Sequence, residues 1–228
     1  MPDTAINSQA AGRIVGLNDT GFEAARGATA GTVSTAAQLS SAVSFSKLSG
    51  RGSSIYSFTR YFIDFNTSAI TTTVTSATIT IKSNSTGNSA DIILVKSDAF
   101  GGGGSSLGSS DFDNLDFSKP YSDEVSSWNT NGSTNTITLN ALARSDIQSN
   151  NNFVVAIVEH DHDFNGTDTE FSELSTFIGI ESGGSDIHLD ITHAASGFVH
   201  TVVGVAGPDL GEVKGVATAN VSEVIGVS

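Results

Sequence analysis

Short runs of β-branched and aromatic residues, separated by Gly, Ser, Asn and Asp, fill the middle of this chain, and strong helix formers are sparse. Runs of this kind are typical of strands bounded by turns. Eight segments fit the pattern: 42–47, 57–65, 77–82, 91–96, 134–139, 152–159, 176–180 and 186–192. Eight strands of this length predict an all-β, antiparallel two-sheet sandwich.

Two of these segments also predict which side chains are buried. Between residues 60 and 65, Tyr61, Ile63 and Phe65 alternate with Arg60, Phe62 and Asp64, so the first set is expected to face the core. Residues 153–158 are apolar at every position, which predicts a central strand covered on both sides or lying near a subunit contact.

The remaining segments define the domain organisation that we expect. Residues 100–108 are rich in glycine and predict a flexible loop, and residues 141–147 predict a short helix that closes one end of the sandwich. Residues 1–40 have weak periodicity and are open to three interpretations: an arm, an early strand or part of an interface. The sandwich then spans 41–193, and a C-terminal tail spans 194–228.

The tail repeats one short phrase three times. Glycines at 204, 215 and 226 lie eleven residues apart, each within a Val-x-Gly-Val phrase. A repeat this short cannot bury its own apolar face and gains a core by stacking on other copies or other chains. We therefore predict that the tail serves in assembly. Either three chains wind their repeats around a shared axis, or the tail adds strands to the sheet of a neighbouring subunit. A disordered tail is the alternative. The residues assigned to assembly are Val202, Gly204, Val205, Val213, Gly215, Val216, Val224, Gly226 and Val227.

Charge and composition exclude several classes of protein. The 228 residues carry 10 Lys and Arg against 24 Asp and Glu, a formal net charge of −14, which repels phosphate backbones and argues against a nucleic-acid partner. The absence of cysteine excludes disulfides and thiolate metal sites. We expect no membrane partner, because no apolar run approaches the ~20 residues that span a bilayer. The first residues lack a secretory pattern, so synthesis in the cytoplasm is expected.

A family resemblance appears within residues 41–193. The run 60–70, with its Arg, alternating strand and Asp-Phe-Asn-Thr-Ser sequence, together with 74–81, resembles the opening of a jelly-roll module found in virion proteins of tailed bacteriophages and in some bacterial surface proteins. Trp128, the strand 136–140 and the segment 153–163 resemble later strands of that module, and the terminal repeats resemble those at the ends of phage structural proteins. The resemblance implies a virion location, synthesis in a host cytoplasm, and capsid or tail subunits as partners.

One loop has the spacing of calcium ligands. Asp161, Asp163 and Asn165 occupy positions 1, 3 and 5, Gly166 occupies position 6, and Thr167 supplies a carbonyl at position 7. Position 12 is a serine, and the flanks predict strands rather than helices. Calcium is therefore one interpretation, and an acidic turn without a metal is the other.

Other candidate chemistry is weaker. His160 and His162 could form half of a zinc site, but no third ligand is identifiable. Residues 104–108 match Gly-x-Ser-x-Gly without the strand and helix that this motif needs. The carboxylates at 111, 113 and 116 are interleaved with Phe112, Leu115 and Phe117, which are expected to anchor a solvated loop. We predict no enzymatic activity.

Carbohydrate binding is the rival function, since sugars stack on exposed aromatic rings. Phenylalanine accounts for 13 of the aromatic residues, and Tyr121 and Trp128 are the candidates for a glycan-contacting patch. A tryptophan that fills the edge of the sandwich is the alternative interpretation.

Overall fold

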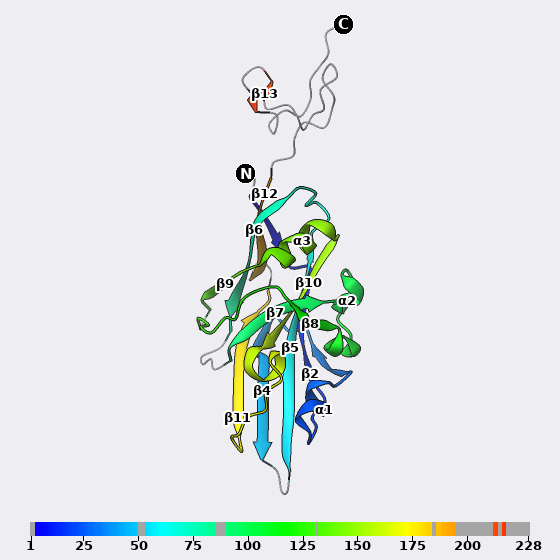
Figure 1. The fold of residues 1–228 in the computed structure, drawn as a ribbon, viewed down its shortest axis with the longest axis vertical. Helices are drawn as coiled ribbons and strands as arrows, with labels where there is room; N and C mark the ends of the chain where they lie inside the picture. The colour runs from blue at the N-terminus through cyan, green and yellow to red at the C-terminus, as the bar shows by residue number, and fades with distance from the viewer. Residues whose placement is uncertain are drawn as a thin grey trace.

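The computed structural model describes residues 3–49, 53–84, 90–130, 132–183 and 186–194, together with the pairs 212–213 and 216–217. Within these residues, twelve strands join in one antiparallel sheet (Figure 1). The strands are β1 (Asp3–Asn7), β2 (Ala10–Gly16), β3 (Gly31–Ser34), β4 (Gln38–Ser49), β5 (Ser54–Asn66), β6 (Val74–Ser83), β7 (Ile92–Ser97), β8 (Leu115–Pro120), β9 (Thr134–Thr138), β10 (Asn152–Glu159), β11 (Leu174–Glu181) and β12 (Ile187–His193).

The order along the sheet is β1-β12-β6-β11-β4-β5-β10-β7-β8. Three strands lie off this path: β9 pairs with β6, β2 pairs with β5, and β3 pairs with β2. The all-β antiparallel class and the eight predicted strands are confirmed. The strands are not divided into two separate sheets, as the sequence led us to expect.

Strand β5 explains why the sheet is continuous. Its first half pairs with β4, from Ser54 to Thr59, and its second half pairs with β10, from Tyr61 to Asn66. Strand β2 pairs with the middle of β5 from Thr59 to Asp64, so it occupies the opposite edge. One long strand thus connects groups of strands that would otherwise form two sheets.

Residues 1–40 contain β1, β2, β3 and the short helix α1 (Phe22–Arg26). Strand β1 pairs with β12, where Asp3 lies opposite Thr192, and β2 pairs with β5. The start of the chain is therefore hydrogen-bonded into the sheet at two places.

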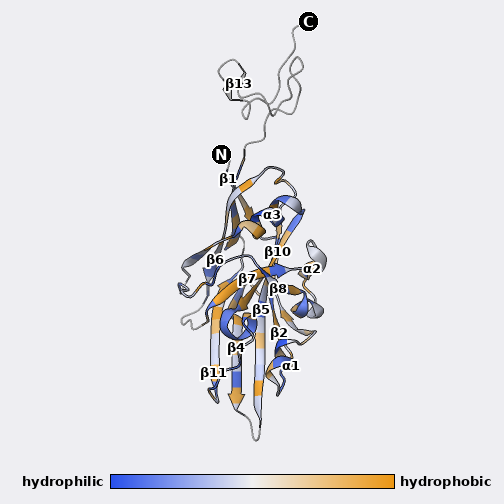
Figure 2. Ribbon diagram, in the orientation of Figure 1, coloured by the Kyte–Doolittle hydropathy of each residue, from blue (hydrophilic) through white to orange (hydrophobic). Residues whose placement is uncertain are grey.

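Two apolar clusters lie on opposite faces of β5 and β10. Tyr61, Ile63 and Phe65 belong to the larger cluster, which also takes side chains from β6, β9, β12 and the helix α3 (Ala141–Ser149). Phe58 and Phe62 belong to the smaller cluster, which is covered by α1 and the segment 99–117. The prediction that β10 is covered on both sides is confirmed, and hydrophobic positions colour the central strands (Figure 2).

The same arrangement corrects one prediction about β5. The face with Arg60, Phe62 and Asp64 was expected to point away from the core, yet all three are buried, because α1 and the segment 99–117 cover it. Phe112, Leu115 and Phe117 anchor this segment as predicted, but the loop is not solvated throughout: Asp111 is buried, and its carboxylate accepts hydrogen bonds from the backbone N–H groups of Phe100 and Gly108.

The helical elements are short. Helix α3 confirms the predicted helix and begins at Asn140, whose Oδ1 accepts a hydrogen bond from the backbone N–H of Ala143 at 3.1 Å. The glycine-rich loop forms the turn α2 (Ala99–Gly102) and then the 3-10 helix η1 (Ser109–Asp113). None of the described helices is long and apolar enough to cross a membrane.

Part of the tail is described. Strands β13 (Glu212–Val213) and β14 (Val216–Ala217) pair antiparallel, with Val213 opposite Val216. The other residues assigned to assembly lie outside the described residues: Val202, Gly204, Val205, Gly215, Val224, Gly226 and Val227.

Candidate functional site

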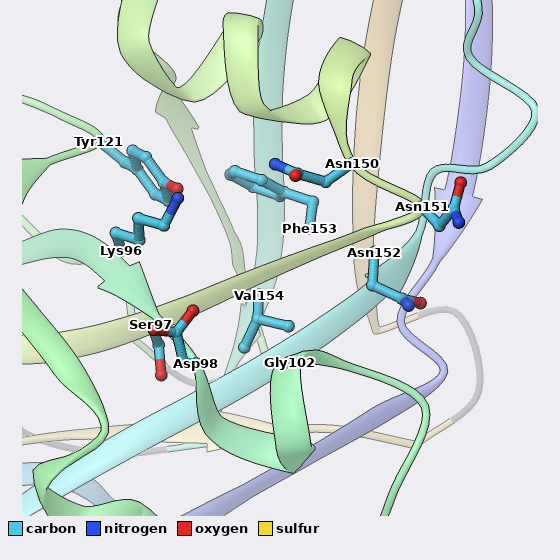
Figure 3. A pocket seen from close by; sticks show the side chains of 10 residues that line it. All are labelled: Lys96, Ser97, Asp98, Gly102, Tyr121, Asn150, Asn151, Asn152, Phe153 and Val154. Atoms are coloured by element: carbon cyan, nitrogen blue, oxygen red, sulfur yellow. The ribbon is translucent and has the colours of Figure 1, made fainter.

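A polar hollow of about 250 Å³ lies where β7, β10, the end of α3 and the α2 turn meet (Figure 3). Phe153 and Val154 of β10 line it, but both side chains are buried, one in each of the two apolar clusters on opposite faces of the sheet. The rim is polar and comes from three segments that are distant in sequence: Lys96, Ser97, Asp98, Tyr121, Asn150, Asn151 and Asn152. The hollow is therefore a product of the fold rather than of one local motif.

Helix α3 is fixed to one wall of the hollow by Asp146. Its carboxylate accepts a hydrogen bond from Lys96 Nζ at 2.9 Å and a second one from the Tyr121 hydroxyl. Burial and the hydrogen bond to Asp146 raise the pKa of Tyr121, so the hydroxyl stays protonated at neutral pH. Asp146 balances the positive charge of the Lys96 ammonium group, so this wall has no net positive charge. The two hydrogen bonds of Asp146 also hold Lys96 and Tyr121 in place.

The opposite wall depends on a run of left-handed residues. Phe100 has a φ of 58°, and the glycines at 101 to 104 follow with φ between 67° and 113°. A Cβ on Gly103 would lie 2.3 Å from Cβ of Asn152, so only glycine fits there. The backbone N–H of Gly104 donates to the buried Asp64 carboxylate at 2.6 Å. The loop expected to be flexible is thus tied to β5.

Two groups on the rim have spare hydrogen-bonding capacity. Among the described residues, nothing bonds to the exposed carboxylate of Asp98 or to the side-chain amide of Asn151. A hollow lined by amide, carboxylate and hydroxyl groups can bind a small neutral ligand that carries several hydroxyls. Asp98 and the neutralised Lys96 disfavour anionic ligands.

The acidic loop with calcium-like spacing forms the π-helical turn η2 (His160–Phe164), directly after β10. Glu159 fixes the turn, because its carboxylate accepts hydrogen bonds from the backbone N–H groups of His162 at 2.6 Å and Asp163 at 3.2 Å. Burial raises the pKa of Glu159.

Asp163 itself is buried and faces inward. Both of its carboxylate oxygens accept hydrogen bonds from Arg60, at 2.7 and 2.8 Å. Arg60 also donates to the backbone oxygens of Phe112 at 2.8 Å and Arg26 at 2.7 Å, and its guanidinium lies 4.1 Å from the centre of the Phe112 ring. This network joins β5, α1, η1 and η2.

The other proposed calcium ligands do not converge with Asp163. Asp161 is exposed and lies beside His160, with 3.2 Å between its Oδ1 and Nδ1 of His160. The backbone oxygen of Thr167 is hydrogen-bonded to the His162 ring at 2.7 Å, and the Asn165 amide lies 3.5 Å from the ring of His160. No group of three or more His, Asp or Glu residues in the described part of the chain has the arrangement of a metal site.

The aromatic residues proposed for glycan stacking are both buried. Trp128 is 7 % exposed and its Nε1 donates to Oγ of Ser83 at 3.2 Å, which agrees with a tryptophan that fills the edge of the sheet. Tyr121 is 1 % exposed and reaches the hollow only at its wall. Neither ring offers an open face for a sugar.

Sequence reasoning missed the hollow and the network around Arg60. Asn150, Asn151 and Asn152 form an asparagine run in the sequence, and this run was the available signal for the rim.

Comparisons with known proteins do not add a function: no protein-family model matches the chain, and no curated protein is significantly similar to it.

Proposed function

We propose that the protein is a non-enzymatic structural component of a virus particle, a capsid decoration or fibre-like subunit that associates with other copies and attaches through its terminal segments. The observation that carries the proposal is the pairing of the first strand with the last strand of the body. Asp3 of β1 lies opposite Thr192 of β12, so the N-terminal end and the start of the tail lie side by side (Figure 1). Segments that leave from one place can engage one attachment surface.

The terminal repeat adds a second line of support. In its middle copy, Val213 pairs with Val216 and Glu212 pairs with Ala217, so the two strands of this copy are two residues long. Strand pairs this small are not stable alone and gain stability by adding to a larger sheet. The proposal therefore assigns the repeats to contacts with other copies or with capsid or tail subunits.

We also propose that the body is a jelly roll whose two halves are joined by β5. The larger apolar cluster takes side chains from β5, β7 and β10 and from β6, β9 and β12. A core shared by two groups of strands is the packing expected of a sandwich.

Deletion of residues 200–228 tests the attachment role. The deletion is expected to leave a folded body, by circular dichroism, and to abolish association in light scattering and incorporation into particles. A chain that ends in the same residues in shuffled order is the matched control, because it keeps length and charge. An unchanged oligomer together with normal incorporation of the deleted chain would contradict the proposal.

The hollow supports a second candidate function, contact with a neutral glycan. The observation in its favour is the pair of unused polar groups, Asp98 and Asn151, on the rim of the hollow. Saturation-transfer NMR with neutral methyl glycosides should give a signal that Asn151→Ala and Asp98→Ala remove. Asn18→Ala, an exposed asparagine outside the hollow, should preserve it. Absence of a signal with the unmodified chain would exclude this function for the sugars used.

A further inference from the structure

We propose that an uncovered, uncharged part of the sheet is a contact surface between two copies of this chain. The surface, here called the open face, consists of Ser44, Ser46 and Leu48 of β4, Ile55 and Ser57 of β5, and Ser175 of β11. The proposal adds a second contact to the proposed function and rests on it only in requiring that copies associate.

Strand register places these side chains on one face. Leu48 lies opposite Ile55, and Ser46 lies opposite both Ser57 and Ser175. Directly paired residues of antiparallel strands point to the same side of a sheet, as do residues two apart on one strand. The open face therefore crosses three adjacent strands at the end of the body remote from β1 and β12 (Figure 1).

The two faces of this part of the sheet differ in what covers them. The other face carries Phe45, Tyr56 and Phe58, which are buried under α1 and η2. On the open face, Leu48 is 55 % exposed and Ile55 is 39 % exposed. Hydrophobic colour reaches the lower ends of β4 and β5 in Figure 2.

Two neighbouring exposed hydrophobic side chains lie on this surface. Of the five large hydrophobic residues that are exposed in the described part of the chain, Leu48 and Ile55 lie on the open face, and Leu17 follows β2, which pairs with β5. The other two lie elsewhere: Phe171 belongs to the segment that contacts Lys47 and Tyr56 on the other face, and Leu142 is on α3. Exposed apolar groups that lie side by side mark interaction sites more often than isolated ones do.

Charge identifies the partner as a second copy. Two chains of net charge −14 repel each other over most of their surfaces, yet none of the six residues of the open face is ionisable. Small hydroxyls between two aliphatic side chains match the same surface in another copy, which is the requirement for a two-fold symmetric contact. Glu173, just before β11, marks the border of this neutral area.

The size of the open face sets the strength of the contact. Six positions, on strands ~4.8 Å apart and ~6.8 Å apart along each strand, cover roughly 200 Å² per copy. A stable interface buries about 800 Å² per partner, so this contact alone is weak and reversible. It becomes effective when the terminal segments hold the copies close together.

Cysteine cross-linking tests the proposal directly, because the full-length chain contains no cysteine. Ser46→Cys lies at the centre of the open face, and sheets packed face to face are ~10 Å apart, within reach of a short bis-maleimide. We expect cross-linked dimers with Ser46→Cys, and few with Ser149→Cys at the exposed end of α3. Equal cross-linking of both variants would overturn the proposal.

Charge variants provide an independent readout. Ile55→Glu and Leu48→Glu should weaken association in sedimentation velocity by roughly tenfold or more, because they bring buried carboxylates together. Leu142→Glu, an equally exposed position away from the face, should have no effect. Unchanged association in both face variants would refute the contact. The two proposals fail differently: absence of Ser46 cross-linking in a chain that still associates through residues 200–228 overturns only the contact, and unchanged association of the chain without residues 200–228 overturns only the attachment role.

Discussion

The network around Arg60 provides the sharpest prediction for stability. Asp163→Asn keeps the shape of the side chain but removes its charge, so the guanidinium of Arg60 stays buried, at 0 % exposure, without a counter-ion. The variant also replaces one acceptor of the two-point hydrogen bond with an amide that cannot accept. The other two carbonyl acceptors of Arg60, on Phe112 and Arg26, remain.

The expected magnitude follows from the burial of both partners. Removing one member of a buried ion pair costs about 3 to 5 kcal/mol. This is a large part of the roughly 5 to 15 kcal/mol that stabilises a typical domain. For a chain of this size it corresponds to a fall in the melting temperature of about 6 to 20 °C.

Urea unfolding followed by circular dichroism measures the effect. Asp161→Asn is the matched control: it lies in the same turn, its side chain is 58 % exposed, and its substitution should change stability by less than about 0.5 kcal/mol. Arg60→Met combined with Asp163→Leu should cost less than the sum of the single variants, because both charges leave together. If Asp163→Asn costs no more than Asp161→Asn, the reasoning about this network is wrong.

Three further predictions concern the loops around the sheet. Gly103→Ala should destabilise the fold by roughly 2 to 5 kcal/mol in thermal melts, through backbone strain and the clash with Asn152, whereas Gly102→Ala, with open space around it, should cost less. The raised pKa of Glu159 means that this group favours the folded state below about pH 4.5 and loses that contribution as the pH rises through its folded-state pKa. Glu159→Gln should therefore gain stability relative to the unmodified chain from pH 4 to 7 in urea titrations at each pH, and a flat difference would contradict this. A chelator should leave the melting temperature unchanged, because Asp163 is held by Arg60; a fall that added Ca²⁺ reverses would instead establish a calcium site.

Local patterns were sufficient to predict the strands of the core. Strand β10 is apolar at every position, and β5 alternates over its second half, so periodicity alone identified both. Strands β1, β2, β3 and β8 were not predicted. Their sequences contain few bulky apolar residues at alternate positions, as in Ala-Ala-Gly at the start of β2, so their pairing depends on β12, β5 and β7 rather than on their own composition.

The candidate sites depend on contacts that a local pattern cannot contain. Arg60 meets Asp163 from 103 residues away and Phe112 from 52 residues away, so nothing next to Arg60 indicates that it is buried. The calcium spacing in residues 161–167 was real as a sequence pattern, but it did not reveal that Asp163 already has a cation as partner. In the same way, Tyr121 and Trp128 were recognised as aromatic residues with a polar group, and the fold uses that group for internal hydrogen bonds.

The pairing of β1 with β12 has a consequence for the order of events during synthesis. Asp3 and its partner Thr192 are 189 residues apart, so the partner of Asp3 is translated only after most of the body. A ladder between such distant residues closes late, because the ends of a long loop must first come together. The valine-rich repeats follow β12 in the sequence, so they leave the ribosome only after the strands that complete the body.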